Sequence, residues 1–203
     1  MSGMVQPVAL AADVPQEPDQ HEHDVVQVSN WHEFCDAVES GQDVEFQADV
    51  TAEGVVTVDG EMTVDLNDKH LDLSGFGLVN QGKLTVLDGA MENGHSDSGG
   101  AVMNKKGAEL RLQNVTLTGN RANKMGGAVK NEGSLYLEDV TMTQNQANRG
   151  GGLYNTGELT LTGQVQIVDN SSDNAVLTDT SYVTVLDGAI GEVPVRTVSG
   201  ETG

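Results

Sequence analysis

The sequence predicts an all-β chain: a parallel β-solenoid of about six to seven coils with an amphipathic capping helix at its N-terminal end. Three observations support this fold. A unit of about 24 residues recurs three times, opening with "GGAVMN", "GGAVKN" and "GGGLYN" at residues 99, 126 and 150. Apolar and polar residues alternate inside each unit, as in a half-buried strand. Aromatic residues make up only 3% of the chain, so small aliphatic side chains must build the core.

Each unit has the same internal order of apolar strands and polar corners. A glycine follows the opening Asn, then two Leu residues one position apart, then a second apolar pair and a closing Asn. The Leu pairs are Leu110/Leu112, Leu135/Leu137 and Leu159/Leu161, and the closing residues are Asn120, Asn145 and Asn170. We assign the double glycines to corners, because glycine adopts backbone angles that a Cβ forbids. The predicted corner glycines are Gly99, Gly100, Gly126, Gly127, Gly151 and Gly152.

A leucine-rich repeat is the competing interpretation of this pattern. The spacing Leu112-x-x-Val115-x-Leu117-x-x-Asn120 matches the first part of such a repeat. A leucine-rich repeat then needs a return segment with its own Leu positions. Here a double glycine follows instead, and it disfavours a helix by about 1 kcal/mol per residue. We therefore favour the β-solenoid, whereas a helix content above about 15% would favour a leucine-rich-repeat-like binding module.

The segment "SNWHEFCDAVESG" predicts the capping helix, within residues 27–41. Asn30 and Glu33 form a capping box, and Gly41 follows the last turn. An apolar stripe of Trp31, Phe34 and Val38, with Cys35 beside it, faces the first coil. The remaining predicted segments are an acidic leader or linker at 1–26, the parallel β-helix at 42–198 and a tail at 199–203. The leader is either a trimmed secretion signal or a plain disordered tail.

Charge and composition exclude several classes of partner. The net charge is −21 and the isoelectric point is near 4.2. Nucleic acid and anionic membranes attract basic surfaces, so neither is an expected partner. No stretch approaches 18 consecutive apolar residues, so we expect no transmembrane helix. The single cysteine, Cys35, leaves no internal disulfide.

The repeat resembles the right-handed parallel β-helix proteins of the pectin-lyase-like superfamily. The "GGAV" segments resemble the GGA-[ILV] motif of the bacterial polymorphic outer-membrane proteins. Leu117-x-x-Asn120, Met142-x-x-Asn145 and Ile167-x-x-Asn170 stand where that family has F-x-x-N, with aliphatic residues in place of Phe. The resemblance implies right-handed coiling and a bacterial passenger domain that is secreted or held at the cell surface.

We find no catalytic constellation, cofactor motif or metal-ligand cluster in the sequence. Glu109 and Glu158 share one slot but lie two rungs apart, about 10 Å. That spacing is too long for a retaining glycosidase pair and slightly long for an inverting one. Asp88 and Asp139 share another slot, at a corner where a turn role is expected. We therefore expect no enzyme; the alternative is a polysaccharide lyase or glycoside hydrolase, which needs a cleft with two carboxylates and a basic residue.

Two sets of polar or aromatic residues are the remaining candidates. Stacked amides at one corner predict a structural ladder of Asn80, Asn104, Asn131 and Asn155. Arg111 and Tyr136 share an outward slot, with Tyr154 on a neighbouring strand, as candidate ligand contacts. We expect a rigid, non-catalytic, adhesin-like scaffold that binds a protein or glycan at a cell surface. The end of the coil stack also favours self-association, end to end or side by side.

Overall fold

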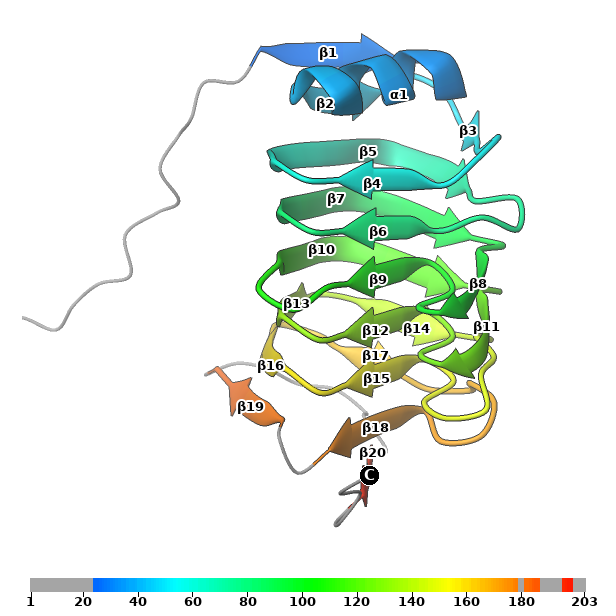
Figure 1. The fold of residues 1–203 in the computed structure, drawn as a ribbon, viewed down its shortest axis with the longest axis vertical. Coiled ribbons are helices and arrows are strands. Elements are labelled where there is room, and N and C mark those ends of the chain that lie inside the picture. The colour runs from blue at the N-terminus through cyan, green and yellow to red at the C-terminus, as the bar shows by residue number, and fades with distance from the viewer. Residues whose placement is uncertain (1–23, 179–180, 187–194, 199–203) are drawn as a thin grey trace, which may run out of the picture.

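A computed structural model describes residues 24–178, 181–186 and 195–198. In this part of the chain, strands stack into a parallel β-solenoid of about six turns with one short helix (Figure 1). Helix accounts for 6% of the structure, which rules out the leucine-rich-repeat alternative. The predicted tail at 199–203 and most of the predicted leader lie outside the described residues.

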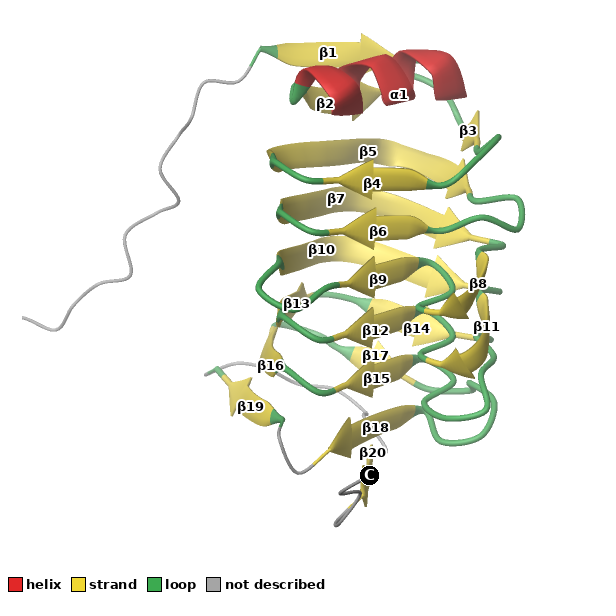
Figure 2. Cartoon of the chain, in the orientation of Figure 1, coloured by secondary structure: helices red, strands yellow, loops and turns green. Residues whose placement is uncertain are grey.

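Three parallel sheets form the coils (Figure 2). Sheet A has eleven strands: β1 (Val25–Val28), β2 (Asp43–Phe46), β3 (Val50–Thr51), β5 (Glu61–Asp72), β7 (Lys83–Glu92), β10 (Glu109–Thr118), β13 (Ser134–Glu138), β14 (Thr141–Thr143), β16 (Glu158–Thr162), β17 (Gln166–Ile167) and β19 (Tyr182–Val185). Sheet B has seven: β4 (Val56–Val58), β6 (Leu78–Asn80), β9 (Val102–Asn104), β12 (Val129–Asn131), β15 (Leu153–Asn155), β18 (Ala175–Thr178) and β20 (Val195–Val198). Sheet C consists of β8 (His95–Ser98) and β11 (Arg121–Met125).

The core follows the predicted alternation. In sheet A, Leu84, Leu110 and Leu135 are register partners along neighbouring strands, and each is no more than 1% exposed. Leu117 and Met142 form a second buried column with 0% exposure. Each such side chain contributes roughly 1.5–3 kcal/mol when it leaves water. Repetition of small aliphatic contacts therefore replaces the large aromatic core that the chain lacks.

The bend within sheet A is made by one column of residues with positive φ. The φ angles of Asp88, Asn114, Asp139 and Gly163 are 49°, 54°, 54° and 62°. Asn, Asp and Gly are the residue types that tolerate this left-handed conformation. The turn role predicted for Asp88 and Asp139 is confirmed.

The glycine corners contain two different glycine roles. Gly99, Gly126 and Gly150 have positive φ angles of 69°, 66° and 60°. The next glycine in each corner has an ordinary φ, but a Cβ there would collide with a backbone carbonyl oxygen of the following coil. The third pair is therefore Gly150 and Gly151, one residue earlier than predicted. Gly152 instead occupies the buried position that Ala128 holds in the coil before.

Helix α1 (Trp31–Ser40) has the predicted ends. The Glu33 N–H donates to the Asn30 side-chain oxygen at 3.1 Å, and Gly41 ends the helix with a φ of 66°. The Glu33 carboxylate accepts from the Ser29 N–H at 2.7 Å, not from the Asn30 N–H as a capping box requires. The carboxylate thus ties the helix to the strand before it.

The apolar side of α1 packs at the N-terminal end of the stack, beside β1, β2 and β4 (Figure 1). Trp31 and Phe34 are buried, whereas Val38 and Cys35 are only half-buried against the core. Strand β1, which pairs with β2, begins at Val25, inside the segment assigned to the leader. In the described part of the chain, a strand of sheet A therefore precedes the helix.

Two amide ladders join successive coils, and all their residues are buried except Asn170, which is half-buried. The predicted ladder is present: the side-chain N–H groups of Asn80, Asn104 and Asn131 donate to the next Asn oxygen at 2.8, 2.6 and 2.6 Å, ending at Asn155. All four residues are 0% exposed. A second ladder was not predicted and joins Asn120 to Asn145 at 3.0 Å and Asn145 to Asn170 at 2.9 Å. The unit-closing Asn residues are thus structural partners, and not only turn formers.

We predict that Phe34→Ala lowers the free energy of unfolding by about 3–5 kcal/mol. Phe34 is 0% exposed, and its ring centroid lies 5.5 Å from that of Trp31 and 5.6 Å from that of Phe46. Guanidinium denaturation followed by circular dichroism measures the change. His32→Ala, on the exposed side of the same helix, is the control and should leave the midpoint in place. An unchanged midpoint for Phe34→Ala would contradict the packing described above.

We predict that Asn104→Ala destabilises the chain by about 1–3 kcal/mol for each buried partner left unpaired. Asn104 donates to the Asn131 side chain and, at 3.0 Å, to the Ser134 carbonyl, and it accepts from Asn80. The matched control is Asn148→Ala, an exposed amide with one bond to the Asn123 carbonyl, which should cost little. Equal denaturation midpoints for the two variants would show that the ladder adds nothing to stability.

Candidate functional site

The connections from sheet A to sheet B differ in length along the stack. Counted from the last buried residue of a sheet A strand to the first buried residue of the next sheet B strand, two connections are short, with six residues at 72–77 and seven at 168–174. The three between them have ten or eleven residues, at 92–101, 118–128 and 143–152. We call these three longer segments the arcs. They contain the double glycines, and the first two contain the strands of sheet C.

The arcs approach the outer face of sheet B. Tyr154 alternates with the core residues of β15 and therefore belongs to that outer face, yet it is only 5% exposed. The Arg149 guanidinium, from the third arc, lies 5.3 Å from the centre of the Tyr154 ring. Tyr154 is thus a buried structural residue. Tyr154 therefore lies in a different sheet from Arg111 and Tyr136 and is not adjacent to that pair.

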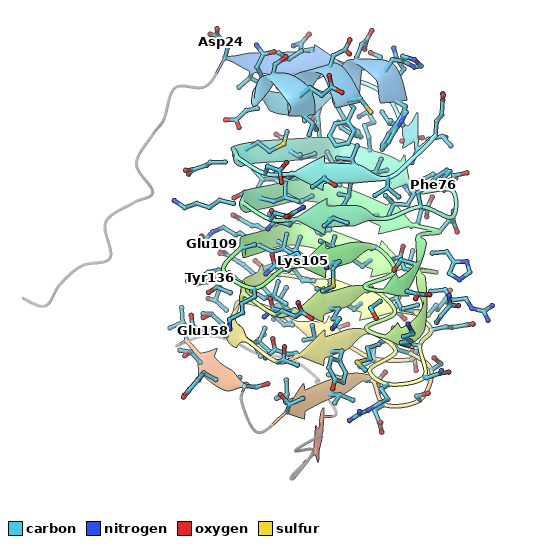
Figure 3. All side chains as sticks on the ribbon, in the orientation of Figure 1. Asp24, Phe76, Lys105, Glu109, Tyr136 and Glu158 are labelled. Carbon is cyan, nitrogen blue, oxygen red and sulfur yellow. The ribbon has the colours of Figure 1, made fainter. Side chains whose placement is uncertain are left out.

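A groove of about 400 Å³ lies where the first arc begins. Its apolar floor includes Val79 and Met103 from the outer face of sheet B, and Val55 stands at its edge. Strand β8 forms one side of the groove, and the other side carries Lys105, Lys130 and Glu132. Figure 3 labels Lys105, and it also labels Phe76 on the short connection at 72–77. This groove was not predicted from the sequence, although the different lengths of the connections indicate it.

Most charged groups at the groove already have partners. The Lys130 ammonium lies 2.6 Å from the Glu132 carboxylate, and the Lys124 ammonium lies 2.9 Å from Asp97. A hydrogen bond from the Asn123 amide, followed by the contact with Lys124, lowers the pKa of Asp97 below its usual value. Among the described residues, Lys105 has no carboxylate within ion-pair distance. The groove therefore presents one free ammonium group beside an apolar floor.

Arg111 and Tyr136 lie side by side on the outer face of sheet A, as predicted. They are register partners on β10 and β13, and the Arg111 guanidinium carbon is 4.5 Å from the centre of the Tyr136 ring. The Glu109 carboxylate lies 3.8 Å from the same guanidinium, whose side chain is 41% exposed. Figure 3 labels Glu109, Tyr136 and Glu158 along one side of the stack. This stacked pair is a rigid, partly exposed polar and aromatic surface.

The carboxylates on this face do not converge as a catalytic pair. Glu109 and Glu158 are both register partners of Ser134, so they lie two rungs apart, as predicted. The Ser134 hydroxyl donates to Glu158 at 3.1 Å. Two rungs correspond to about 10 Å, beyond the separations of glycosidase pairs. This column is therefore a set of surface contacts between coils.

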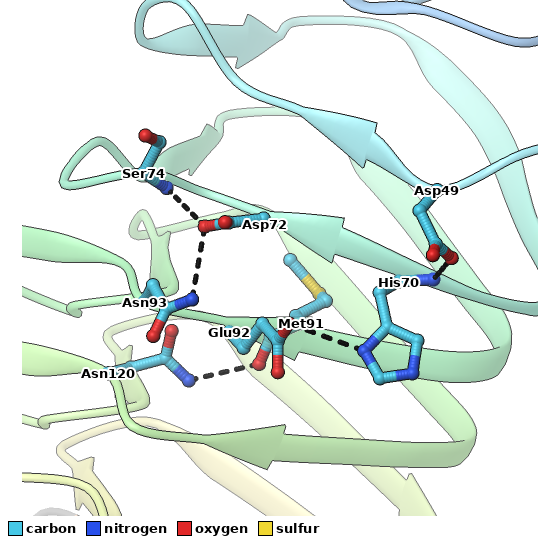
Figure 4. A network of polar contacts seen from close by, with 8 residues as sticks. All are labelled: Asp49, His70, Asp72, Ser74, Met91, Glu92, Asn93 and Asn120. Atoms are coloured by element: carbon cyan, nitrogen blue, oxygen red, sulfur yellow. Dashed lines mark hydrogen bonds and ion pairs between the residues drawn. The ribbon is translucent and has the colours of Figure 1, made fainter.

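The carboxylates near the start of the stack close turns and join coils (Figure 4). Asp49 accepts from the His70 N–H at 2.9 Å, and the His70 ring lies 3.3 Å from Glu92. Asp72 accepts from the Ser74 N–H at 2.8 Å and from the Asn93 amide at 3.2 Å. In the described part of the chain, no three His, Cys, Asp or Glu side chains are grouped to hold a metal ion. These polar contacts close turns and join neighbouring coils.

Comparisons with known proteins add no relative to this description. No family model, no curated protein and no solved structure matches the chain. Within the residues that the structure describes, no helix is long and apolar enough to cross a membrane. The groove and the Arg111–Tyr136 pair are therefore the features from which a function has to be argued.

Proposed function

We propose that the chain is a secreted or cell-surface binding scaffold, rigid and non-catalytic, of the adhesin-like type. The Arg111–Tyr136 pair on the outer face of sheet A carries the proposal. The right-handed coiling, the bacterial origin and the relationship to pectin-lyase-like passenger domains rest on the resemblance of the "GGAV" segments. Helix α1, in this proposal, covers the first coil and keeps the strand edges there from aggregating.

The stacked pair suits a sugar ligand. A guanidinium offers several N–H donors in a fixed plane, and a tyrosine offers an apolar ring with a hydroxyl at its tip. Both side chains are held by strands whose alternate residues, Leu110, Leu112 and Leu135, are buried. Because the pair is held in place before binding, little side-chain entropy is lost when a ligand docks. A glycan is therefore the partner that we favour for this face.

We predict that a glycan array shows saturable binding that Tyr136→Ala weakens by at least about tenfold. The loss follows from removing the ring on which Arg111 stacks. Tyr154→Phe is the matched control, because Tyr154 is buried in sheet B and keeps its ring in that variant. Thr160→Ala, one rung further along the same column, should have a smaller effect. No glycan bound at about millimolar concentration, or equal binding by Tyr136→Ala, would refute this assignment.

A carbohydrate-active enzyme is the second candidate function. It is favoured by one observation: the groove contains two carboxylates, Asp97 and Glu132, and the free ammonium of Lys105. Against it, both carboxylates form ion pairs, and the lowered pKa of Asp97 is opposite to what a general acid requires. We therefore rank catalysis below binding.

We predict no turnover of acidic or neutral polysaccharides by the intact chain. Reducing-end assays, and absorbance assays for unsaturated products, measure hydrolysis and elimination respectively. Asp97→Asn and Glu132→Gln serve as matched variants of unchanged size. Turnover that both variants abolish would overturn the non-catalytic proposal and place the reaction in the groove. Turnover that neither variant changes would place the reaction outside the groove and would equally overturn the non-catalytic proposal.

A further inference from the structure

Strand β8 has one paired edge and one edge without a partner strand. In the described part of the chain, sheet C contains only β8 and β11, which pair in parallel. The connection at 72–77, in the coil before β8, runs beside the first arc up to the start of β8. There the His95 N–H donates to the Phe76 carbonyl at 2.9 Å. The short connection then turns into sheet B at Gly77, whereas the first arc continues outward. Beyond His95, the edge of β8 that faces the short connection therefore has no neighbouring strand.

The groove lies along this edge. Residues 95–99 form one of its sides, and Val55, Val79 and Met103 supply apolar surface. Val55 is 62% exposed, whereas Met103 is 8% exposed. An unpaired strand edge above an apolar floor is the arrangement that accepts an added strand: main-chain hydrogen bonds supply affinity, and alternate side chains enter the pockets. The groove thus occupies the place that an arc would fill if the connection at 72–77 were long.

Strand β11 shows how such a strand sits against β8. Its residues Arg121 and Ala122 are register partners of His95 and Ser96, and Met125 is the partner of Ser98. Ala122 is 3% exposed, whereas Arg121 is exposed. A short segment with alternating small and basic residues is therefore compatible with this sheet. The three residues of β8 beyond His95 set the length of the added strand.

The lining of the groove is balanced in charge, with Asp97 and Glu132 against Lys105 and Lys130, but the acidic excess of the coils before it favours a basic partner. Residues 24–98, which include β8 and every coil before it, contain sixteen Asp and Glu residues but only two lysines. A surface with such a negative excess attracts cationic ligands and speeds their association. Lys105, with its free ammonium, lies on the opposite side of the groove and suits a carboxylate or carbonyl at one end of the segment. The other end would lie toward the acidic coils.

We propose that an extended peptide segment with small or apolar residues and basic flanks binds in this groove as an added strand on the free edge of β8. The site is separate from the Arg111–Tyr136 face in sheet A, so its failure and the failure of the glycan proposal are distinguishable. The ligand is recognised mainly through its backbone, with specificity from the apolar floor and from charge. Binding needs no movement of the core, because the strand fills existing space.

The test uses the intact chain and a labelled synthetic peptide, GNRANKMGGA, which copies residues 119–128. Fluorescence anisotropy should show saturable binding below about 1 mM that weakens with salt. The peptide with proline in place of its first alanine should bind at least about tenfold more weakly, because it lacks a main-chain donor. Amide shifts in an ¹H–¹⁵N spectrum should centre on β8 and Val79.

Variants of the protein separate groove binding from other binding. Val79→Arg places a bulky cation on the floor and should weaken binding at least about tenfold. Val55→Arg is a second variant at a more exposed position, where folding is not at risk. Thr141→Arg on sheet A adds the same charge elsewhere and should leave binding unchanged. The proposal would be overturned if the peptide did not bind at up to about 1 mM, or if both groove variants bound it as tightly as the unchanged protein does. Amide shifts confined to β11 would overturn it as well.

Discussion

The stacking of buried asparagines is the interaction on which the rest of the structure depends. A buried primary amide without partners loses several kcal/mol relative to water. Each rung here avoids this loss because its N–H donates to the next Asn, as from Asn104 to Asn131 at 2.6 Å. No buried side-chain nitrogen or oxygen among the described residues lacks a partner. A one-residue slip would move an amide out of line and bring a neighbour such as Lys130 or Glu132 into its place, so the ladders fix the register of the coils that they join.

Register in turn determines what lies on the outside of the solenoid. When Leu110 stacks on Leu135, the intervening outward residues must stack as well, which places Arg111 beside Tyr136. The same rule places Asn114 one rung from Asp88, and their side chains are joined at 2.9 Å. Surface geometry in this fold is thus a consequence of core geometry. An exposed pair can be positioned as rigidly as a buried one.

This dependence explains which features were predictable from the sequence. Repetition revealed the coils, the first ladder and the neighbours in sheet A, because each depends on residues at equal positions in successive units. The second ladder was equally visible at Asn120, Asn145 and Asn170, but an Asn at a corner is normally sufficient as a turn residue. The burial of Tyr154 was not predictable in this way. It depends on Arg149 reaching over from an arc, and the repeat pattern does not describe how far a connection extends.

The groove also arises because the repeat determines the core positions but not the lengths of the connections between strands. The short connection at 72–77 and the first arc at 92–101 leave the same buried column, at Leu71 and Met91, and enter the same column in sheet B, at Leu78 and Val102. Four additional residues in the arc change no core contact, yet they create an unpaired strand edge above an apolar floor. Connections tolerate such changes far better than core positions do. A solenoid can therefore acquire a groove on its surface by changing the length of one connection, while the ladders keep the coils that they join in register.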